Sequence, residues 1–258
     1  MAPDDSGCVR VKMPGNLLDN SDFLVAQAGY GGKHGNVIYA ADRWAQDDTT
    51  GRTYSSVAKD GHRALKCSTA TRIQQKLVLL SGEAYTAACY VDDTLYIVSF
   101  TASGGAYGSG TLQVNCQSDG TYMFIVADIP AGGIVSEPVL YRGSYTSDSL
   151  PPYEPKGYAA ELAECQRYFT RGTYCVARPN STEKIVSVYT CEVRYPTRMR
   201  IEQPTVAFTN VKRWTDQTDQ SIGLGKNMGD AYGFNSVNLS ESIDNALIQF
   251  DYTASADL

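Results

Sequence analysis

PPYEPKGYAAELAECQRYF, the stretch from Pro151 to Phe169, differs in character from the sequence on either side of it. It follows a segment rich in Ser and Gly, and its own prolines favour a turn or linker over regular structure. Apolar residues then recur at spacings of four, three and four, which predicts one amphipathic helix of about three turns. These residues are Tyr158, Leu162, Cys165 and Phe169. We therefore expect a linker and a short helix over residues 144–170, between two separate domains.

The sequence before this stretch alternates between apolar and polar residues in many short segments, which is the pattern of half-buried β-strands. Turn-forming clusters such as DDTTG, DGH, SDG and PAGG separate these segments, and no helical period accompanies them. The expected strands cover residues 36–45, 52–59, 62–68, 72–80, 84–92, 95–102, 111–117, 121–129 and 134–143. Many short strands without helices predict a β-sandwich, here a jelly roll over residues 16–143.

Alternation returns after the predicted helix. The expected strands of this part cover residues 184–195, 198–210, 230–240 and 245–258. In the last of them one face carries Ala246, Ile248, Phe250 and Tyr252, and polar residues take the other. The predicted fold class is therefore all-β: an N-terminal jelly-roll β-sandwich, one short connecting helix, and a smaller C-terminal β-sandwich tip domain over residues 171–258.

Bulk composition limits the function classes. The chain has 258 residues, 43% of them hydrophobic, and a net charge of −6 with acids in excess in both halves, so neither half is a basic surface for nucleic acid. The first fifteen residues carry acids where a signal peptide needs basic residues, and the longest aliphatic run, LVLL, is too short to span a bilayer. We expect synthesis in a cytoplasm and no membrane insertion. Seven cysteines without a CxxC motif favour reduced packing residues.

Three segments bring up a family resemblance. NLLDNSDF, residues 16–23, followed by Trp44, resembles the start of the carbohydrate-binding-module-like jelly rolls of bacteriophage fibres and spikes. Residues 151–169 are similar to a recurring element of that family, in which the last jelly-roll strand runs through a Pro-Tyr/Phe-Glu-Pro turn into an ELxxCQRYF helix. The closing FDYTASADL resembles the terminal strand of the same proteins. The resemblance covers residues 16–258, and the central string is its most specific part.

This resemblance implies a virion fibre, spike or tail-tip protein, usually a homotrimer, that attaches to the host surface, often through glycans. Because no long repetitive shaft precedes the first domain, a compact head or tail spike is expected at the virion surface. Residues 1–15 are expected to anchor the protein to capsid, portal, collar or tail proteins, or else to form an unstructured tail. The alternatives are a structural decoration or collar fibre that binds no receptor, and a bacterial glycan-binding module or polysaccharide-degrading enzyme.

Sugar recognition uses aromatic rings and planar polar side chains that hydrogen-bond to hydroxyl groups. Two Gly-rich segments, residues 29–36 and 103–110, are predicted loops that expose a tyrosine, and a polar loop carries a tryptophan. RYPTRMR predicts a strand with three arginines on one face, which suits an acidic polysaccharide. The glycan-binding candidates are Tyr30, Tyr107, Trp214, Arg194, Arg198 and Arg200. The alternative is that these rings pack or form turns and that the arginines are solvated or paired with acids. Trp44 is expected in the core.

The predicted helix needs a partner surface, because an isolated helix this short is marginal in water. Its stripe of Tyr158, Leu162, Cys165 and Phe169 either packs on the second β domain or lines a trimer interface about a threefold axis, and both can hold together.

No catalytic residues are expected. The only histidines are His34 and His62, no GxSxG or HExxH motif is present, and adjacent acids such as Asp92 and Asp93 lie in turn-like contexts. No cofactor is expected either, although jelly-roll sugar binders often carry a structural calcium ion. Asn20, Asp22 or Asp148 could supply oxygen ligands to it.

Overall fold

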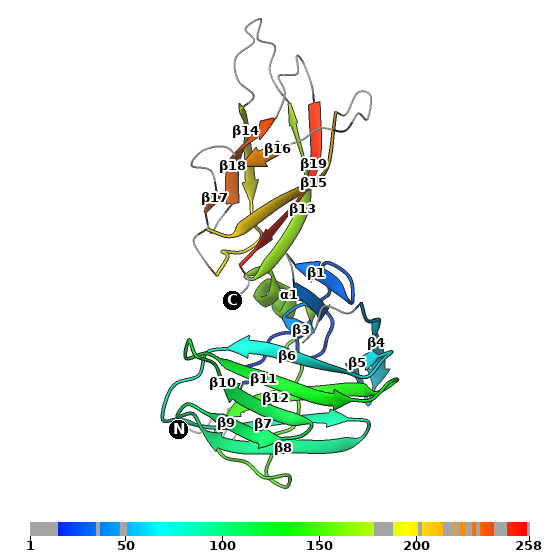
Figure 1. Cartoon of the computed structure of the whole chain (residues 1–258), viewed down its shortest axis with the longest axis vertical. Coiled ribbons are helices and arrows are strands. Elements are labelled where there is room, and N and C mark those ends of the chain that lie inside the picture. The colour runs from blue at the N-terminus through cyan, green and yellow to red at the C-terminus, as the bar shows by residue number, and fades with distance from the viewer. Residues whose placement is uncertain are drawn as a thin grey trace, which may run out of the picture.

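The computed structural model describes residues 15–34, 37–46, 51–177, 188–200, 203–213, 219, 222–224, 229–230, 233–239 and 247–256. Its strands form several antiparallel sheets, and the described residues contain one α-helix. Figure 1 shows two β-rich bodies arranged along the long axis of the molecule, with helix α1 at the point where they meet. The predicted all-β fold class with one short helix is confirmed.

The N-terminal domain is a sandwich of two antiparallel sheets. The seven-stranded sheet has the order β1-β2-β3-β6-β11-β10-β9, and the five-stranded sheet has the order β4-β5-β12-β7-β8. The strands are β1 Gly32–His34, β2 Val37–Ala41, β3 Trp44–Gln46, β4 Tyr54–Lys59, β5 His62–Cys67, β6 Thr71–Leu77, β7 Ala84–Val91, β8 Thr94–Thr101, β9 Ala106–Ser109, β10 Leu112–Cys116, β11 Tyr122–Ile129 and β12 Ile134–Arg142. The chain crosses repeatedly between the two sheets, as in a jelly roll.

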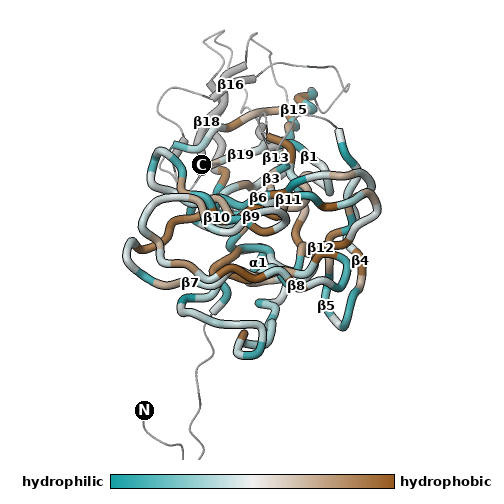
Figure 2. The backbone as a smooth tube through the Cα atoms, turned by 60° about the horizontal axis from the view of Figure 1, so that its bottom comes forward, coloured by the Kyte–Doolittle hydropathy of each residue, from teal (hydrophilic) through white to brown (hydrophobic). Residues whose placement is uncertain are grey.

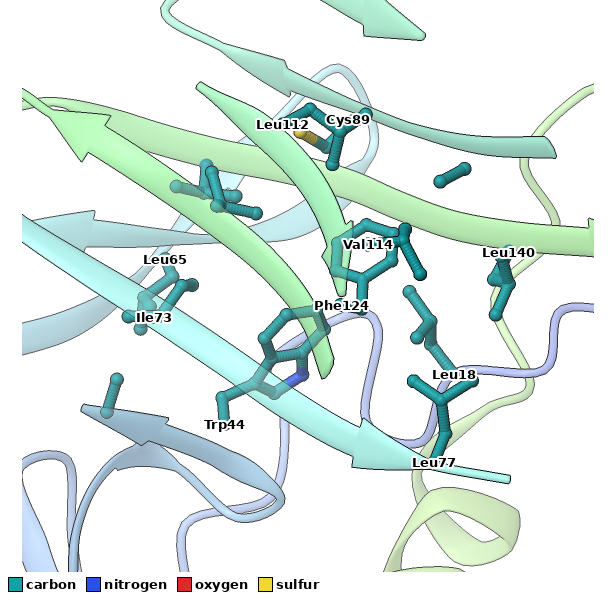
Figure 3. Packing of buried hydrophobic residues seen from close by; sticks show 14 of the residues in the cluster. Leu18, Trp44, Leu65, Ile73, Leu77, Cys89, Leu112, Val114, Phe124 and Leu140 are labelled. Atoms are coloured by element: carbon teal, nitrogen blue, oxygen red, sulfur yellow. The ribbon is translucent and has the colours of Figure 1, made fainter. Parts of the chain in front are cut away.

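The core lies between the two sheets and is centred on Trp44, which is fully buried (Figure 3). Its ring lies 5.2 Å from that of Phe23 and 5.8 Å from that of Phe124, the latter edge-on. The indole N–H donates a hydrogen bond to the carbonyl of Asn20 at 3.0 Å, so the buried polar group is satisfied. The expectation that Trp44 is a core residue is confirmed.

The strand pattern was predicted well where one face is buried, and less well elsewhere. The strand expected over residues 36–45 divides into β2 and β3, because a turn with Arg43 in the left-handed region (φ 72°) interrupts it. The two Gly-rich segments expected to be loops each contain a short strand instead. These strands, β1 and β9, are the edges of the seven-stranded sheet.

The C-terminal domain contains two further sheets, with strand orders β13-β19-β15 and β14-β18-β16, and β17 pairs with β18. The strands are β13 Phe169–Ala177, β14 Val188–Arg194, β15 Thr205–Arg213, β16 Ile222–Leu224, β17 Gly229–Asp230, β18 Gly233–Leu239 and β19 Leu247–Ser255. Along β19 the alternation holds, since Ile248, Phe250 and Tyr252 are buried. Ala246 lies outside the described residues. Strand β13 was not predicted, and β15 begins well after the start of the expected strand.

Helix α1, Tyr158–Gln166, is shorter than predicted and buries a different face. Its buried residues are Glu161 and Cys165, whereas Leu162 is half-buried and Tyr158 is exposed. Phe169 is buried, but as the first residue of β13. The prediction that Leu162 lies on the buried face of the helix is therefore wrong. Its neighbour Glu161, with a carboxylate side chain, lies there instead.

Glu161 joins the helix to the start of the N-terminal domain. Its carboxylate accepts hydrogen bonds from the backbone N–H groups of Asn20 and Ser21, the latter at 3.2 Å. Burial raises the pKa of this carboxyl group, and the hydrogen bond from the Asn20 N–H opposes that shift.

Further contacts lie where the two domains meet. The guanidinium group of Arg43 lies 3.4 Å from the centre of the Tyr168 ring, and that of Arg200 lies 5.4 Å from the same ring. The side-chain amide of Gln27 donates to the carbonyl of Phe169 at 2.8 Å. The backbone N–H of Arg200 donates to the carbonyl of Arg167 at 2.8 Å. Residues from both domains and from the helix therefore meet around Tyr168.

Replacement of Glu161 by Gln tests the importance of this carboxylate. Gln retains one acceptor oxygen, but its amide NH2 group then faces a backbone N–H, so we expect the free energy of unfolding to fall by about 1–3 kcal/mol. The measurement is urea unfolding followed by circular dichroism. Glu164→Gln is the matched control in the same helix: its carboxylate pairs with Lys156 in a partly exposed salt bridge, so its loss costs about 0–1 kcal/mol. Equal stability of the two variants would contradict the role given to Glu161.

Candidate functional site

The outer face of the seven-stranded sheet carries a band of polar side chains. In β6 every second residue, from Thr71 to Leu77, is buried against the core, which turns Arg72, Gln74 and Lys76 outward. The register of β6, β11 and β10 continues the band across the sheet. Gln74 and Gln113 flank Ile125, and Lys76 and Asn115 flank Met123. Figure 2 shows the resulting alternation of hydrophilic and hydrophobic residues along the tube of this domain.

A groove of about 480 Å³ lies at one end of this band. The described residues that line it are Arg52, Ala70, Thr71, Arg72, Gln113, Ala127, Asp128, Ile129 and Pro130. They come from the start of β6, the end of β11, the start of β10 and the segment before β4. The volume falls within the range of about 300–1,000 Å³ that is typical of ligand sites.

A β-bulge shapes one wall of the groove. The register between β11 and β6 shifts between Val126 and Ile129, and Asp128, inside the shift, has a φ of 51°. The bulge leaves the Asp128 side chain exposed at the groove, while Ala127 and Ile129 on either side of it are buried.

The groove can bind by hydrogen bonds and charge. Arg52 and Arg72 present planar donor groups, Gln113 presents an amide that both donates and accepts, and Asp128 presents a carboxylate. Hydroxyl and carboxylate groups of a sugar are the partners that such side chains recognise. The described lining holds one carboxylate, whereas glycoside hydrolysis by the usual route uses two.

The two predicted loop tyrosines are half-buried and pack against the sandwich core. The Tyr30 hydroxyl donates to the carbonyl of Phe23 at 2.8 Å. The Tyr107 ring stacks on Phe100 with 4.5 Å between centroids, and its hydroxyl accepts from the Ser103 N–H at 2.9 Å. The expectation that these rings are exposed on flexible loops is wrong, because both belong to segments that complete the edges of the sandwich. Neither is among the residues that line the groove.

The three predicted arginines do not lie on one strand. Arg194 ends β14 and is exposed, Arg198 is exposed in an irregular segment, and Arg200 is half-buried near Tyr168. Pro196 follows the strand end closely and cannot donate to a β-ladder. The inward side of the expected alternation is present nevertheless, since Tyr195 and Met199 are buried. Trp214 lies outside the described residues.

The four residues predicted for a trimer interface separate into two groups. Cys165 and Phe169 are 1% and 3% exposed inside the chain, so they are not available for contact with another copy. Tyr158 is 56% exposed and Leu162 is half-buried, so only these two can reach a partner.

The three residues that could supply oxygen ligands to calcium each take part in hydrogen bonds within the chain. The Asn20 amide bonds to the backbone of Val25 and Asp42, and Asp22 accepts from the Tyr153 hydroxyl at 2.8 Å. Asp148 accepts from the Ser147 hydroxyl at 3.2 Å. In the described part of the chain no group of three or more His, Cys, Asp or Glu side chains is placed to hold a metal ion.

The cysteines whose side chains the structure describes, Cys67, Cys89, Cys116, Cys165 and Cys175, are free thiols. Cys67, Cys89 and Cys165 are buried, and burial raises the pKa of the Cys67 and Cys89 thiols to about 12. Asp92 and Asp93 form the turn between β7 and β8, as their positive φ angles show. No helix among the described residues is long and apolar enough to cross a membrane.

Comparison of the chain with protein-family models and with curated proteins found no match.

Sequence reasoning did not single out the groove residues. The signal that could have found them is the alternation within the expected strands, because Arg72 stands between the buried Thr71 and Ile73, and Gln113 between the buried Leu112 and Val114. What brings them together is the pairing of β6 with β11 and of β11 with β10, which connects segments about forty residues apart.

Substitution of Tyr107 tests its role in closing the sandwich edge. Tyr107→Ala removes the ring that stacks on Phe100, so we expect the free energy of unfolding to fall by about 2–4 kcal/mol. Tyr107→Phe keeps the stack and loses only the exposed hydrogen bonds of the hydroxyl to Ser103, at a cost of about 0.5–1.5 kcal/mol. Chemical denaturation measures both values. If both variants were as stable as the wild type, Tyr107 would not be an edge-packing residue.

Proposed function

We propose that this chain is an attachment module of a bacteriophage spike or short fibre, which binds host-surface glycan in the groove of its N-terminal domain. The observation that carries the proposal is the groove itself, with two arginines, a glutamine and an aspartate around a volume suited to a ligand. The family resemblance of residues 16–23 and 151–169 supports the biological setting. No covalent chemistry is part of the proposed function.

The groove favours a polar and acidic glycan. A guanidinium group donates two parallel hydrogen bonds to a carboxylate, and Arg52 and Arg72 both line the site. Gln113 also donates to the Gly110 carbonyl at 2.8 Å, which restricts the orientation of its amide. A side chain held in this way loses less entropy when a ligand binds. Asp128 then accepts from sugar hydroxyl groups at the exposed wall.

The assembled protein is proposed to be a homotrimer at the virion surface, attached to capsid, portal, collar or tail proteins through residues 1–15. All but the last of these residues lie outside the described part of the chain. Of the predicted interface residues, the exposed Tyr158 offers the larger apolar surface to another copy, and the half-buried Leu162 lies on the same helix.

Binding to host polysaccharide tests the groove. Arg72→Gln removes the charge and the bidentate geometry, so we expect binding of purified host-surface polysaccharide to weaken by at least about tenfold. Biolayer interferometry with immobilised polysaccharide measures the change, and the free protein should block phage adsorption. Arg63→Gln is the control, since Arg63 is exposed on β5 and bonds to Ser56. If binding weakened equally in both variants, or did not weaken in Arg72→Gln, the groove would not be the binding site. Release of sugar from the polysaccharide would favour an enzyme instead.

Native mass tests the trimer. By light scattering we expect a wild-type mass near three times 28.0 kDa. Tyr158→Asp should shift the mass toward the monomer, because it places a charge in the proposed interface. Val78→Asp, at another exposed apolar position, should leave the mass unchanged. A monomeric wild type would overturn the trimer.

A further inference from the structure

A second cavity lies on the opposite sheet of the N-terminal domain, beneath the linker that leads to the helix. It has a volume of about 140 Å³. Its lining residues are Ala88, Tyr90, Leu95, Glu137, Val139, Ser147, Leu150, Pro151, Pro152 and Tyr153. The linker contributes half of this lining and packs on the outer face of the five-stranded sheet through Tyr145, Leu150 and Tyr153. The volume is below that of a typical ligand site, so it suits one functional group with few attached atoms.

Glu137 is the one carboxylate among the described lining residues, and the backbone places it there by an unusual conformation. Its φ is 50°, in the left-handed region that non-glycine residues seldom adopt. The register of β12 against β7 shifts between Ser136 and Val139, so Glu137 lies in a β-bulge. Bulges of this kind redirect a side chain, and strained residues cluster at functional sites.

The Glu137 carboxylate has no hydrogen bond or ion pair from any described residue. It is nevertheless half-buried, and this burial raises its pKa, with Asp60 and Asp22 acting in the same direction. The charges of His62 and Lys59 oppose this shift, but neither side chain donates a hydrogen bond to the carboxylate. Partial burial of a carboxylate that accepts no hydrogen bond costs free energy. A cationic donor in the cavity would offset that cost.

The other walls suit a small organic cation. Tyr90 and Tyr153 contribute aromatic rings, which attract ammonium groups through cation–π interactions. Tyr153 is held in place, since its hydroxyl donates to Asp22 at 2.8 Å and its ring meets that of His62 edge-on at 5.1 Å. Leu95 and Val139 offer apolar contact to the carbon atoms that are bonded to the charged nitrogen.

We propose that this cavity binds an organic ammonium group, of the kind carried by an amino sugar, with Glu137 as its counter-ion. The ammonium chemistry follows from the cavity, whereas the choice of an amino sugar as its source rests on the proposed glycan-binding function. The site is separate from the groove, because the two share no lining residue. One chain then binds two kinds of group on a polysaccharide: acidic groups in the groove and an ammonium group in the cavity.

The test is an NMR titration of protein labelled in its tyrosine rings. Propylammonium chloride and glucosamine are expected to shift the signals of Tyr90 and Tyr153. The neutral counterparts, propanol and N-acetylglucosamine, are expected to leave them in place. Propylammonium tests the cavity without reference to any glycan, so its result is independent of the polysaccharide assay of the groove.

Two variants remove the carboxylate. Glu137→Gln keeps the shape of the side chain, and Glu137→Gly suits the left-handed backbone. Both are expected to weaken propylammonium binding at least tenfold. Glu154→Gln, at an exposed linker carboxylate that does not line the cavity, is the control and is expected to bind as the wild type does.

Three outcomes would overturn the proposal: no response of the wild type to propylammonium, equal responses to propylammonium and propanol, or unchanged binding in both Glu137 variants. A response to a blocked lysine derivative with none to glucosamine would overturn the amino-sugar assignment in favour of a protein partner.

Discussion

The buried carboxylate of Glu161 is the interaction on which the arrangement of this protein depends. A carboxylate that is buried away from water needs several hydrogen-bond donors. The backbone N–H groups of Asn20 and Ser21 are two of them. Asn20 in turn is tied by its side chain to Val25 and accepts the indole hydrogen bond of Trp44 through its carbonyl. A polar path of a few bonds therefore leads from the helix to the centre of the sandwich core.

This path explains why the linker lies where it does. Tyr153, just before the helix, bonds to Asp22 and Ser21, so the chain reaches the helix along the outer face of the five-stranded sheet. That face is covered by the linker, while the outer face of the seven-stranded sheet keeps its band of polar side chains. The two sheets therefore have different surroundings: the groove lies at the end of the polar band, and the smaller cavity lies beneath the linker.

Much of the fold could be predicted from the sequence, because a strand with one buried face has a strict period of two. Residues 71–77 show this, as do Ile248, Phe250 and Tyr252 in the other domain.

The prediction failed where the cause of the structure does not lie in the local sequence. Glu161 looks like a solvent-facing residue of an amphipathic helix, but its buried carboxylate accepts hydrogen bonds from Asn20 and Ser21, some 140 positions away. The edge strands β1 and β9 are Gly-rich and gain their structure from a neighbouring strand. The groove and the cavity could not be predicted, because both are formed by pairings between distant segments and by bulges at Asp128 and Glu137.

The C-terminal domain begins and ends at the same place. Phe169, the first residue of β13, is paired with Ser255 near the end of β19, and the Ala256 N–H donates to the carbonyl of Tyr168. At the other end of the same pair, Ala177 lies opposite Leu247. The two ends of the domain therefore lie on adjacent strands beside the helix, where Arg200 adds contacts to Arg167 and Tyr168. Neither the groove, nor the cavity, nor the hydrogen bonds of Glu161 include a residue of this domain, so its far end can vary in sequence while all three keep their residues.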